Sequence, residues 1–487
     1  MHLRGTSAIE PGGGRSRRAR GGGPGRLAAS VLLIGLLFGC QGGTRPVAIG
    51  NEGGTGGKNE GGSGGDEPTW TFRTLDGADD TGYQPELRLA PDGRLAAVWY
   101  RPTDREGICQ LADREPGATD IWEIVYGIEG TIGGSFEQEV VTEIELVGRP
   151  TGLSLAFEPG GAPLVAFMGG EQAEFRCGAT DSVIARRGPG GWTQEIIDEE
   201  GDVPAMVFEE DVEHCANYQN ACNLGGVVGL WPALGIFEGQ PILAYRDIHF
   251  GFGVDAEEKS DLQLYWRGGL ITAEAVSGAG SFTRLVVDEA EAIHIAHFNP
   301  YHVVSDVTQD YTDGIWFIHY EGGEWSRERV LPIGEIGEGI GLATVEDRLG
   351  LAWFEPKAGR IRYLEREAGT WGSPEVVDAR GRTGLSPSLA FDAQGRAAVS
   401  YRLCGAAGQQ GIDCQAPDDR LRFAVRTDDG WETTTVRSEA GKQEGLYTSL
   451  VFDGDGRPAV AFQESFFDSI DQVVRRRLVL AHREAAP

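Results

Sequence analysis

The sequence predicts an all-β fold, a seven-bladed β-propeller built from four-stranded antiparallel blades. The main observation is a repeated unit, clearest in residues 388–402, in which two runs of alternating apolar residues flank an Asp-x-x-Gly turn. This pattern is typical of two short antiparallel strands joined by a tight turn. Copies recur roughly 50 to 80 residues apart, a spacing that indicates propellers or solenoids. The seven copies are residues 87–101, 153–168, 234–246, 284–298, 342–354, 388–402 and 449–463.

Each hairpin is followed by two further strand-like segments, and Trp opens several of the last ones. Four such segments in a row make one antiparallel blade. We expect the third and fourth strands of the first six blades at 121–126 and 136–141, 182–187 and 192–197, 262–267 and 270–276, 315–320 and 325–331, 361–366 and 371–377, and 421–426 and 431–436.

The last blade needs a strand from elsewhere in the chain. The seventh copy is followed by a third strand at 478–483, and the sequence then ends at Pro487. The segment 70–75 precedes the first hairpin and has the Trp-led pattern of a fourth strand. We therefore predict that it completes the last blade, which covers an otherwise exposed sheet edge.

The N-terminal segment has the composition of a targeting sequence. A basic region with Arg15, Arg17 and Arg18 precedes the apolar run 27–38, which is too short to span a bilayer comfortably. The run ends in Leu-Phe-Gly-Cys and so resembles a bacterial lipobox, which implies that residues 1–40 are a signal peptide and that Cys40 is lipidated. By the same resemblance, Gln41 after the cysteine implies the outer membrane. An ordinary secretory signal or a short anchor with an incidental cysteine is the alternative.

The rest of the chain divides into a linker and one domain. Residues 41–67 are rich in Gly and poor in large apolar residues, so we expect a flexible tether, and we assign residues 68–487 to the propeller. The net charge of −31 argues against nucleic acid and against direct adhesion to anionic lipid. We expect a monomer that meets the membrane through its lipid anchor only.

Six further cysteines suggest disulfides in an exported protein. They are Cys109, Cys177, Cys215, Cys222, Cys404 and Cys414. Cys215–Cys222 and Cys404–Cys414 would each close a short loop, which leaves Cys109 with Cys177. A zinc site is the alternative, but no Cys-x-x-Cys pair supports it. We expect no cofactor and no metal, since His294 and His297 lie three apart on a strand and so face opposite sides.

The blades also resemble those of bacterial repeat proteins with sialidase-like (BNR-type) propellers. In that family the blades read Ser-Leu-Ala-Phe-Asp-x-x-Gly-x-Pro-x-Val-Ala-Tyr, and the resemblance covers residues 69–485. It implies the propeller fold. The sialidase Asp-box (Ser-x-Asp-x-Gly-x-x-Trp) does not occur in this chain, so sialidase activity does not follow from the resemblance.

Strand direction predicts which face of the ring is functional. Turns after the first and third strands are short, whereas connections after the second and fourth strands carry the insertions and all six of these cysteines. Long loops on a rigid scaffold often carry binding sites. At the mouth of this face we expect ligand-binding residues, because guanidinium groups bind oxyanions and aromatic rings stack on sugars. The candidates are the Tyr–Arg pairs Tyr100–Arg101, Tyr245–Arg246 and Tyr401–Arg402, together with Trp231. The alternative is that each Arg pairs with an acidic residue of this acidic chain.

No catalytic motif is evident, so binding of a glycan or a protein is the favoured function. A sialidase-like glycoside hydrolase or a polysaccharide lyase is the first alternative. It would need two carboxylates, or a Tyr with a Glu, within about 5–10 Å beside the arginines. A scaffold in an envelope complex is the second alternative, and a large apolar patch on the rim would indicate it.

Overall fold

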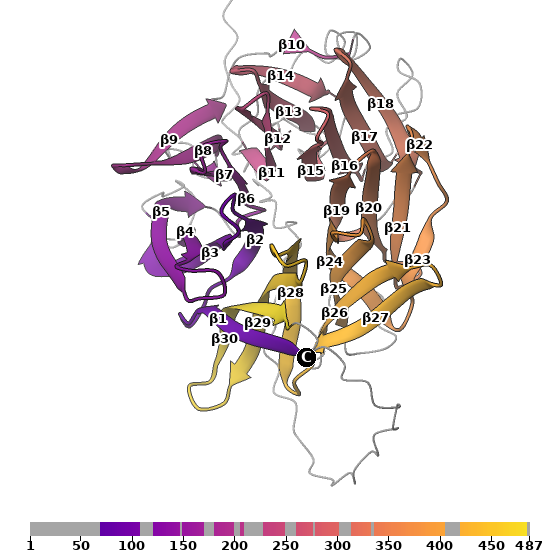
Figure 1. The fold of residues 1–487 in the computed structure, drawn as a ribbon. Helices are drawn as coiled ribbons and strands as arrows, with labels where there is room; N and C mark the ends of the chain where they lie inside the picture. The colour runs from indigo at the N-terminus through magenta and orange to yellow at the C-terminus, as the bar shows by residue number, and fades with distance from the viewer. Residues whose placement is uncertain are drawn as a thin grey trace, which may run out of the picture. The chain divides into compact units, whose positions relative to one another are not determined.

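Alternating apolar residues form strands along the whole described chain. The structure is a computed structural model that describes residues 69–107, 120–146, 149–169, 180–198, 205–208, 227–248, 260–275, 278–300, 313–332, 336–404 and 419–484. Seven antiparallel sheets of at least four strands form a ring, which confirms the predicted propeller (Figure 1). Among the described residues no helix is long and apolar enough to cross a membrane.

The blades follow one another along the chain, and the first strand of each lies innermost. The strands of the first three blades are β2 (Tyr83–Leu89), β3 (Leu95–Glu106), β4 (Asp120–Glu129) and β5 (Phe136–Leu146); β6 (Ser154–Phe157), β7 (Pro163–Gly169), β8 (Asp181–Gly188) and β9 (Gly191–Asp198); and β11 (Val227–Phe237), β12 (Gln240–Ile248), β13 (Ser260–Trp266) and β14 (Gly269–Glu274).

The strands of the fourth to sixth blades are β15 (Ser281–Val287), β16 (Ile293–Asn299), β17 (Gly314–Glu321) and β18 (Glu324–Leu331); β19 (Gly337–Val345), β20 (Arg348–Glu355), β21 (Arg360–Glu367) and β22 (Thr370–Trp371) with β23 (Glu375–Asp378); and β24 (Arg382–Phe391), β25 (Ala397–Cys404), β26 (Arg420–Thr427) and β27 (Gly430–Arg437).

The N-terminal strand closes the ring as predicted. Blade 7 consists of β28 (Lys442–Phe452), β29 (Pro458–Asp468), β30 (Val473–Arg483) and β1 (Trp70–Asp76), and β1 pairs antiparallel with β30. The pairing runs from Trp70 opposite Arg483 to Asp76 opposite Leu478. The outer edge of β30 is therefore covered by a strand from the opposite end of the chain.

Three details differ from the sequence prediction. The fourth strand of blade 5 is split into β22 and β23, because Gly372 and Pro374 interrupt it and proline lacks the N–H that a ladder needs. A short strand, β10 (Ala205–Met206), runs parallel to β14 within a connection expected to be a loop. In blade 7, the connection after the second strand is short rather than an insertion, since β29 continues to Asp468 and β30 begins at Val473.

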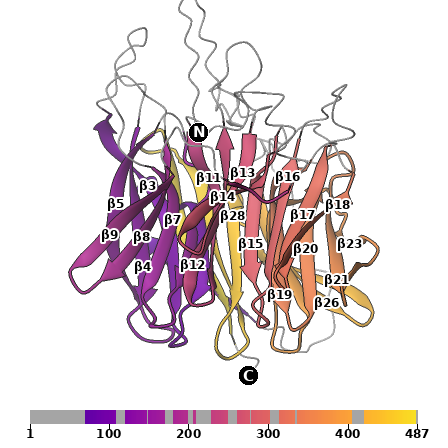
Figure 2. The same ribbon diagram turned by 90° about the horizontal axis from the view of Figure 1, so that it is seen from above.

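The Asp-x-x-Gly turns have a clear physical basis. In blade 6, Asp392 Oδ1 accepts hydrogen bonds from the backbone N–H groups of Gln394 and Arg396, at 2.9 and 2.8 Å. Gly395 in the same turn has a φ of 70°, which glycine adopts without steric cost. Asp453 makes the same pair of bonds in blade 7. These tight hairpins gather along one face of the ring, the lower edge in Figure 2, which we call the hairpin face.

The core lies between neighbouring blades. Between blades 7 and 1, for example, Leu87 and Trp99 are buried against Leu478 and Leu480. Successive residues of a strand pack into the interfaces on opposite sides of the blade. In β7, Val165 and Phe167 pack with blade 1, whereas Leu164 and Ala166 pack with blade 3. This packing leaves the innermost strands around the axis of the ring, where the candidate site lies.

Candidate functional site

The innermost strands share a repeat that places one residue of each blade at the central channel. Every first strand contains a Leu that pairs with the second strand in the same register. The residue before this Leu lines the channel in all seven blades, and we call it the ring position. The ring positions are Glu86, Ser154, Ala233, Arg284, Gly341, Ser388 and Ser449.

Serine at the ring position joins neighbouring blades. Ser154 Oγ accepts a hydrogen bond from the N–H of Leu234 in the next blade at 2.9 Å. Ser388 Oγ accepts one from Leu450 N at 3.0 Å. A backbone donor that would otherwise be unsatisfied is thereby paired. Serine is therefore the structural residue of this ring, and the charged residues Glu86 and Arg284 depart from the pattern.

Two residues before the ring position, the backbone is left-handed in every blade. These bulge positions are Gln84, Gly152, Trp231, Phe282, Gly339, Ser386 and Tyr447, with φ between 46° and 123°. The ladder between the first two strands shifts register here in six blades, as in a β-bulge. A positive φ is unfavourable for large aromatic residues, and such strain is often kept where a side chain serves a ligand site.

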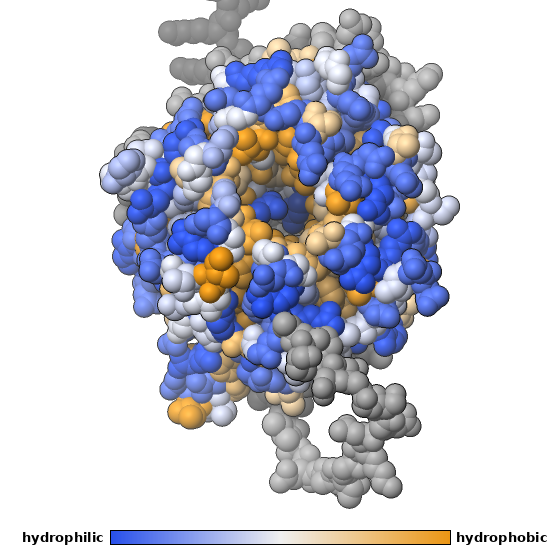
Figure 3. Space-filling view, viewed as in Figure 1, coloured by the Kyte–Doolittle hydropathy of each residue, from blue (hydrophilic) through white to orange (hydrophobic). Residues whose placement is uncertain are grey.

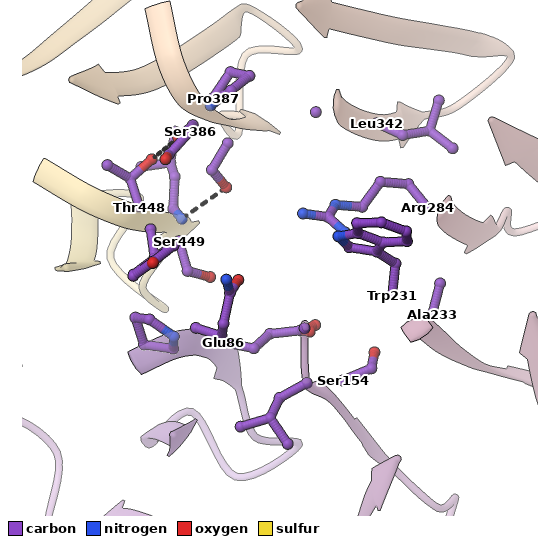
Figure 4. A pocket seen from close by; sticks show the side chains of 18 of the residues that line it. Glu86, Ser154, Trp231, Ala233, Arg284, Leu342, Ser386, Pro387, Thr448 and Ser449 are labelled. Carbon is purple, nitrogen blue, oxygen red and sulfur yellow. Dashed lines mark hydrogen bonds between the residues drawn. The ribbon is translucent and has the colours of Figure 1, made fainter. Parts of the chain in front are cut away.

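The ring and bulge positions surround a cavity of about 120 Å³ on the axis of the ring (Figure 4). Gln84, Trp231, Ser386 and Tyr447 are the bulge-position side chains that line it. Bulges can re-aim side chains in this way. Viewed along the axis, the ring shows a central hollow with apolar residues around its opening and hydrophilic ones deeper inside (Figure 3).

Trp231 is the best-placed aromatic residue of the mouth. Its ring lies 5.1 Å from that of Phe282, and the guanidinium carbon of Arg246 lies 5.6 Å from its centroid. Its backbone N–H donates to Thr151 O of blade 2 at 3.1 Å. A Cβ on the adjacent Gly152 would lie 3.2 Å from Trp231 Cα, so glycine is required for this close approach. The indole is thus fixed at the junction of three blades, with part of its surface exposed.

The cavity contains more positive than negative side chains. Among the described residues that line it, the charged ones are Glu86, Arg88 and Arg284. Glu86 forms an ion pair with Arg88 at 2.5 Å, and Arg88 also donates to Leu155 O of blade 2. Arg284 reaches toward the middle of the cavity (Figure 4). Its one protein acceptor in the described chain is Thr283 O, at 3.0 Å from Nη1.

The three arginines predicted from the sequence occupy other positions than the cavity wall. None of them lines the described cavity. Arg246 and Arg402 are equivalent, since each lies two residues after the residue opposite the ring position. In blade 1, Val98 is the residue opposite the ring position Glu86. The residue equivalent to Arg246 and Arg402 is therefore Tyr100, and Arg101 lies one residue further along the strand. Successive residues of a strand face opposite sides, so Arg101 points away from the direction that Arg246 and Arg402 take.

Each of these arginines contacts other parts of the protein. Arg101 donates to Glu123 at 2.7 Å and to Asp76 at 3.1 Å. Arg402 is buried and donates from Nε to Asp419 Oδ2 at 2.8 Å. Arg246 is also buried, beneath the indole of Trp231. Pairing with acidic residues, the alternative considered from the sequence, is the arrangement that the structure shows for Arg101 and Arg402.

The three predicted tyrosines are fully buried. Tyr100 donates its hydroxyl to Gly152 O at 3.0 Å, and Tyr401 donates to Asp378 Oδ2 at 2.8 Å. Burial raises the pKa of both hydroxyls. Tyr245 packs between blades 2 and 3. Of the predicted ligand-binding residues, Trp231 is therefore the one that lines the cavity, and a binding role for the others stays a prediction.

Other candidate groups have structural partners. His294 bonds Asp288 and His297 bonds Glu274, so the two imidazoles have separate carboxylate partners. Cys404 is buried beside Phe354 and Leu385. Cys40, Cys109, Cys177, Cys215, Cys222 and Cys414 lie outside the described residues, so lipidation and the disulfides stay predictions.

An acidic cluster lies between β27 and β29. Carboxylate oxygens of Glu439, Glu444 and Glu464 lie within 4.8 Å of one another. Arg437 and Lys442 already form ion pairs with this cluster, at 2.8 Å to Glu444 and 3.1 Å to Glu464. Burial raises the pKa of Glu444 to about 7. The two cations supply the charge that a metal ion would supply, so the arrangement is that of an internal salt-bridge network.

Sequence reasoning missed the ring and bulge positions, although a signal for them exists. The Leu of the innermost strand occurs in all seven repeats, at 87, 155, 234, 285, 342, 389 and 450. Aligning the repeats on this Leu places Arg284 and Glu86 at the column that holds Ser154, Ser388 and Ser449. A charged residue in a column of small residues marks a functional exception.

No protein-family model and no curated protein matches the sequence. Solved structures similar to this chain include a protein of unknown function from Dyadobacter fermentans, with 10% identity over 86% of this chain and 100% of that one and a TM-score of 0.45. A K499G mutant of NanB sialidase from Streptococcus pneumoniae is 11% identical over 85% of this chain and 70% of that one, with a TM-score of 0.43. An α-L-arabinanase from Penicillium chrysogenum is 12% identical over 84% of this chain and 98% of that one, with a TM-score of 0.41.

At these identities and TM-scores the likeness concerns the fold alone. The fold-level resemblance to sialidase-like propellers agrees with the seven-bladed ring of the structure. The chain is a seven-bladed β-propeller whose last blade is closed by its N-terminal strand. Its axial cavity is lined by residues from all seven blades.

Proposed function

We propose that this protein is a glycan-binding propeller whose ligand enters the mouth of the axial channel. The observation that carries the proposal is the ring of left-handed bulge positions, which places Trp231, Tyr447 and Gln84 along the cavity wall. Aromatic faces provide large contact area at a low entropic cost, and amide groups hydrogen-bond hydroxyls. These are the side chains that recognition of a sugar needs.

The bulge positions lie toward one end of the channel. Each innermost strand ends at the hairpin face, and the bulge comes early in the strand. We therefore place the proposed mouth at the end of the channel nearer the long connections. This is the face on which loops can surround a ligand.

The place where the chain enters the domain suits a tethered binding protein. Thr69 O accepts a hydrogen bond from Glu484 N at 2.9 Å, and His482 contacts Asp453 of a hairpin turn at 2.8 Å. The chain thus enters the ring beside the hairpin face, opposite the proposed mouth.

Binding without hydrolysis fits the described cavity better than catalysis. Most glycosidases use two carboxyl groups on either side of the scissile bond. Among the described residues that line the cavity, Glu86 supplies the carboxylate, and Arg88 holds it in an ion pair. Tyr447 lines the same cavity, so a Tyr with a Glu is present there, but the carboxylate of Glu86 is engaged by Arg88.

A protein partner is the second candidate, and one surface favours it. The hairpin of β29 and β30 exposes the apolar side chains of Phe467, Ile470, Val473 and Val474. Ile470 is 89% exposed. Clustered exposed apolar residues often mark protein contacts. This surface is separate from the cavity, so the two functions can be tested with different variants.

A glycan array probed with the purified full chain and with Trp231→Gly tests the proposal. Glycine occupies the same bulge position in blades 2 and 5, as Gly152 and Gly339, so the substitution suits the backbone. We expect glycan binding by the natural protein and a loss of about tenfold or more in Trp231→Gly. Circular dichroism and thermal unfolding verify the fold.

Phe467→Ala serves as the matched control, because it removes an exposed aromatic ring outside the channel. Its glycan binding should equal that of the natural protein. Binding that survives Trp231→Gly, or an array without any bound glycan, would count against the proposed site. Loss of a captured protein in Phe467→Ala alone would favour the second candidate.

A further inference from the structure

We propose that the axial cavity contains an oxyanion site, in which Arg284 binds a carboxylate or sulfate group of the ligand. The inference rests on the proposed glycan-binding function in one respect: that function makes the bound anion part of a glycan. Its basis is the exception at the ring position of blade 4, where an arginine replaces the small residue found in five other blades.

The guanidinium of Arg284 has bonding capacity to spare. It carries five N–H donors, and the described chain offers it one acceptor, Thr283 O. Within the described residues no carboxylate oxygen lies within ion-pair distance of it. This is notable in a chain of net charge −31, where many other arginines form ion pairs. A fork of free N–H groups facing a cavity is suited to a bidentate oxyanion.

The opposite side of the cavity adds further donors. Ser154, Ser388 and Ser449 each use Oγ to accept a backbone N–H of the next blade. In the described part of the chain, no protein acceptor takes the hydroxyl hydrogen of these three serines. These O–H groups can therefore point into the cavity they line. A wall of hydroxyl and guanidinium donors is complementary to a group that only accepts hydrogen bonds.

The local charge balance agrees with this reading. Among the described lining residues there are two cations, Arg88 and Arg284, and one carboxylate, that of Glu86. Glu86 is already paired with Arg88, so the charge of Arg284 is not balanced within the cavity. Burial lowers the pKa of Arg284, Arg88 acts in the same direction, and Glu86 acts in the opposite one. An arginine nonetheless stays protonated at neutral pH. An incoming anion would relieve the unfavourable burial of this cation.

The size of the cavity favours a small group over a whole sugar. Its volume of about 120 Å³ admits a carboxylate or sulfate, while the sugar ring that bears the group would remain at the mouth beside Trp231. The recognised ligand class is then an acidic glycan, such as a uronic-acid or sulfated polymer. Free inorganic anions share the same chemistry, and the experiment separates the two sources.

Isothermal titration of the full chain with sodium sulfate, glucuronate and neutral glucose tests the site. The key variant is Arg284→Ser, which restores the residue that blades 2, 6 and 7 carry at the ring position. Arg267→Ser is the matched control, since Arg267 lies in an exposed turn paired with Glu238. We expect sulfate or glucuronate to bind the natural protein and Arg267→Ser about tenfold or more tightly than Arg284→Ser.

The outcomes separate this inference from the proposed function. Tight glucuronate and weak sulfate would assign the site to acidic sugars, and the reverse would assign it to free anions; both support an oxyanion site. Anion binding unchanged in Arg284→Ser, or no anion binding by the natural protein, overturns the inference. If the protein still bound neutral glycans on the array and this binding required Trp231, the proposed glycan-binding function would hold without an oxyanion site.

Discussion

The backbone N–H of Leu87 donates a hydrogen bond to Ser449 Oγ at 2.9 Å, which links the first blade to the last although the residues lie 362 positions apart. The same bond joins blades 2 and 3 and blades 6 and 7. The contact at Ser449 differs from these because it closes the ring. The same serine-to-backbone hydrogen bond thus joins consecutive blades and also closes the ring between the last blade and the first.

We expect Ser449→Ala to lower the free energy of unfolding by about 1–2 kcal/mol, because the Leu87 N–H loses its acceptor in a partly buried place. Chemical denaturation measures the change. Ser388→Ala is the matched control, since it breaks the same bond between consecutive blades. A loss at least as large in Ser388→Ala would show that ring closure adds nothing to this interaction.

Arg402→Ala should be much more damaging, because it removes the guanidinium partner of the buried carboxylate of Asp419. Loss of one partner of a buried ion pair typically costs about 3–5 kcal/mol. Arg267→Ala breaks an exposed pair with Glu238 and should change stability by less than about 1 kcal/mol. Urea unfolding of both variants gives the comparison. An Arg402→Ala protein of natural stability with impaired glycan binding would instead restore Arg402 as a ligand residue.

Most of the fold was predictable because each blade repeats the same local signals. Apolar alternation, the Asp-x-x-Gly turn and a Leu in every innermost strand agree with one another, so local and global preferences coincide. The closing strand was predictable from the missing fourth strand of blade 7. The split between β22 and β23 was not predicted, although its cause, Pro374, is visible in the sequence.

The site was less predictable, for two physical reasons. The Tyr–Arg pairs look alike in sequence, but the structure shifts Arg101 by one residue relative to Arg402, and a shift of one reverses the face of a strand. The bulges place Trp231 and Tyr447 at positive φ, against their local preference. Only the packing of seven blades around one axis imposes that conformation, and no short stretch of sequence encodes it.

Removing the closing strand should destabilise the last blade. A truncation to residues 77–487 deletes β1, exposes the edge of β30 and removes the contact of Trp70 with Phe423, whose rings lie 5.6 Å apart. We expect a lower midpoint of thermal unfolding and a tendency to associate through the free edge. A truncation to residues 68–487 retains β1 and is the control. Equal midpoints and equal elution volumes on gel filtration would show that β1 is dispensable.

The pH dependence of stability should reveal the acidic network between β27 and β29. The pKa of Glu444 is raised from 4.5 to about 7, chiefly by burial, so the folded protein holds a proton that the unfolded chain has released between these values. Stability from this group is therefore present at low pH and lost as pH rises through about 7. Glu444→Gln should match the natural protein below pH 4.5 and exceed it by up to about 3 kcal/mol near pH 8.

Glu439 provides a control of opposite sign in the same network. The hydrogen bond from Lys442 lowers the pKa of Glu439 below 4.5, with Arg437 acting in the same direction. Its contribution is therefore present at neutral pH and lost as the pH falls through the folded-state value. Glu439→Gln should be less stable than the natural protein near pH 8, and this difference should shrink as the pH falls below 4.5. Urea unfolding at several pH values measures both profiles. The same pH profile in both variants would contradict the opposite pKa shifts of Glu444 and Glu439.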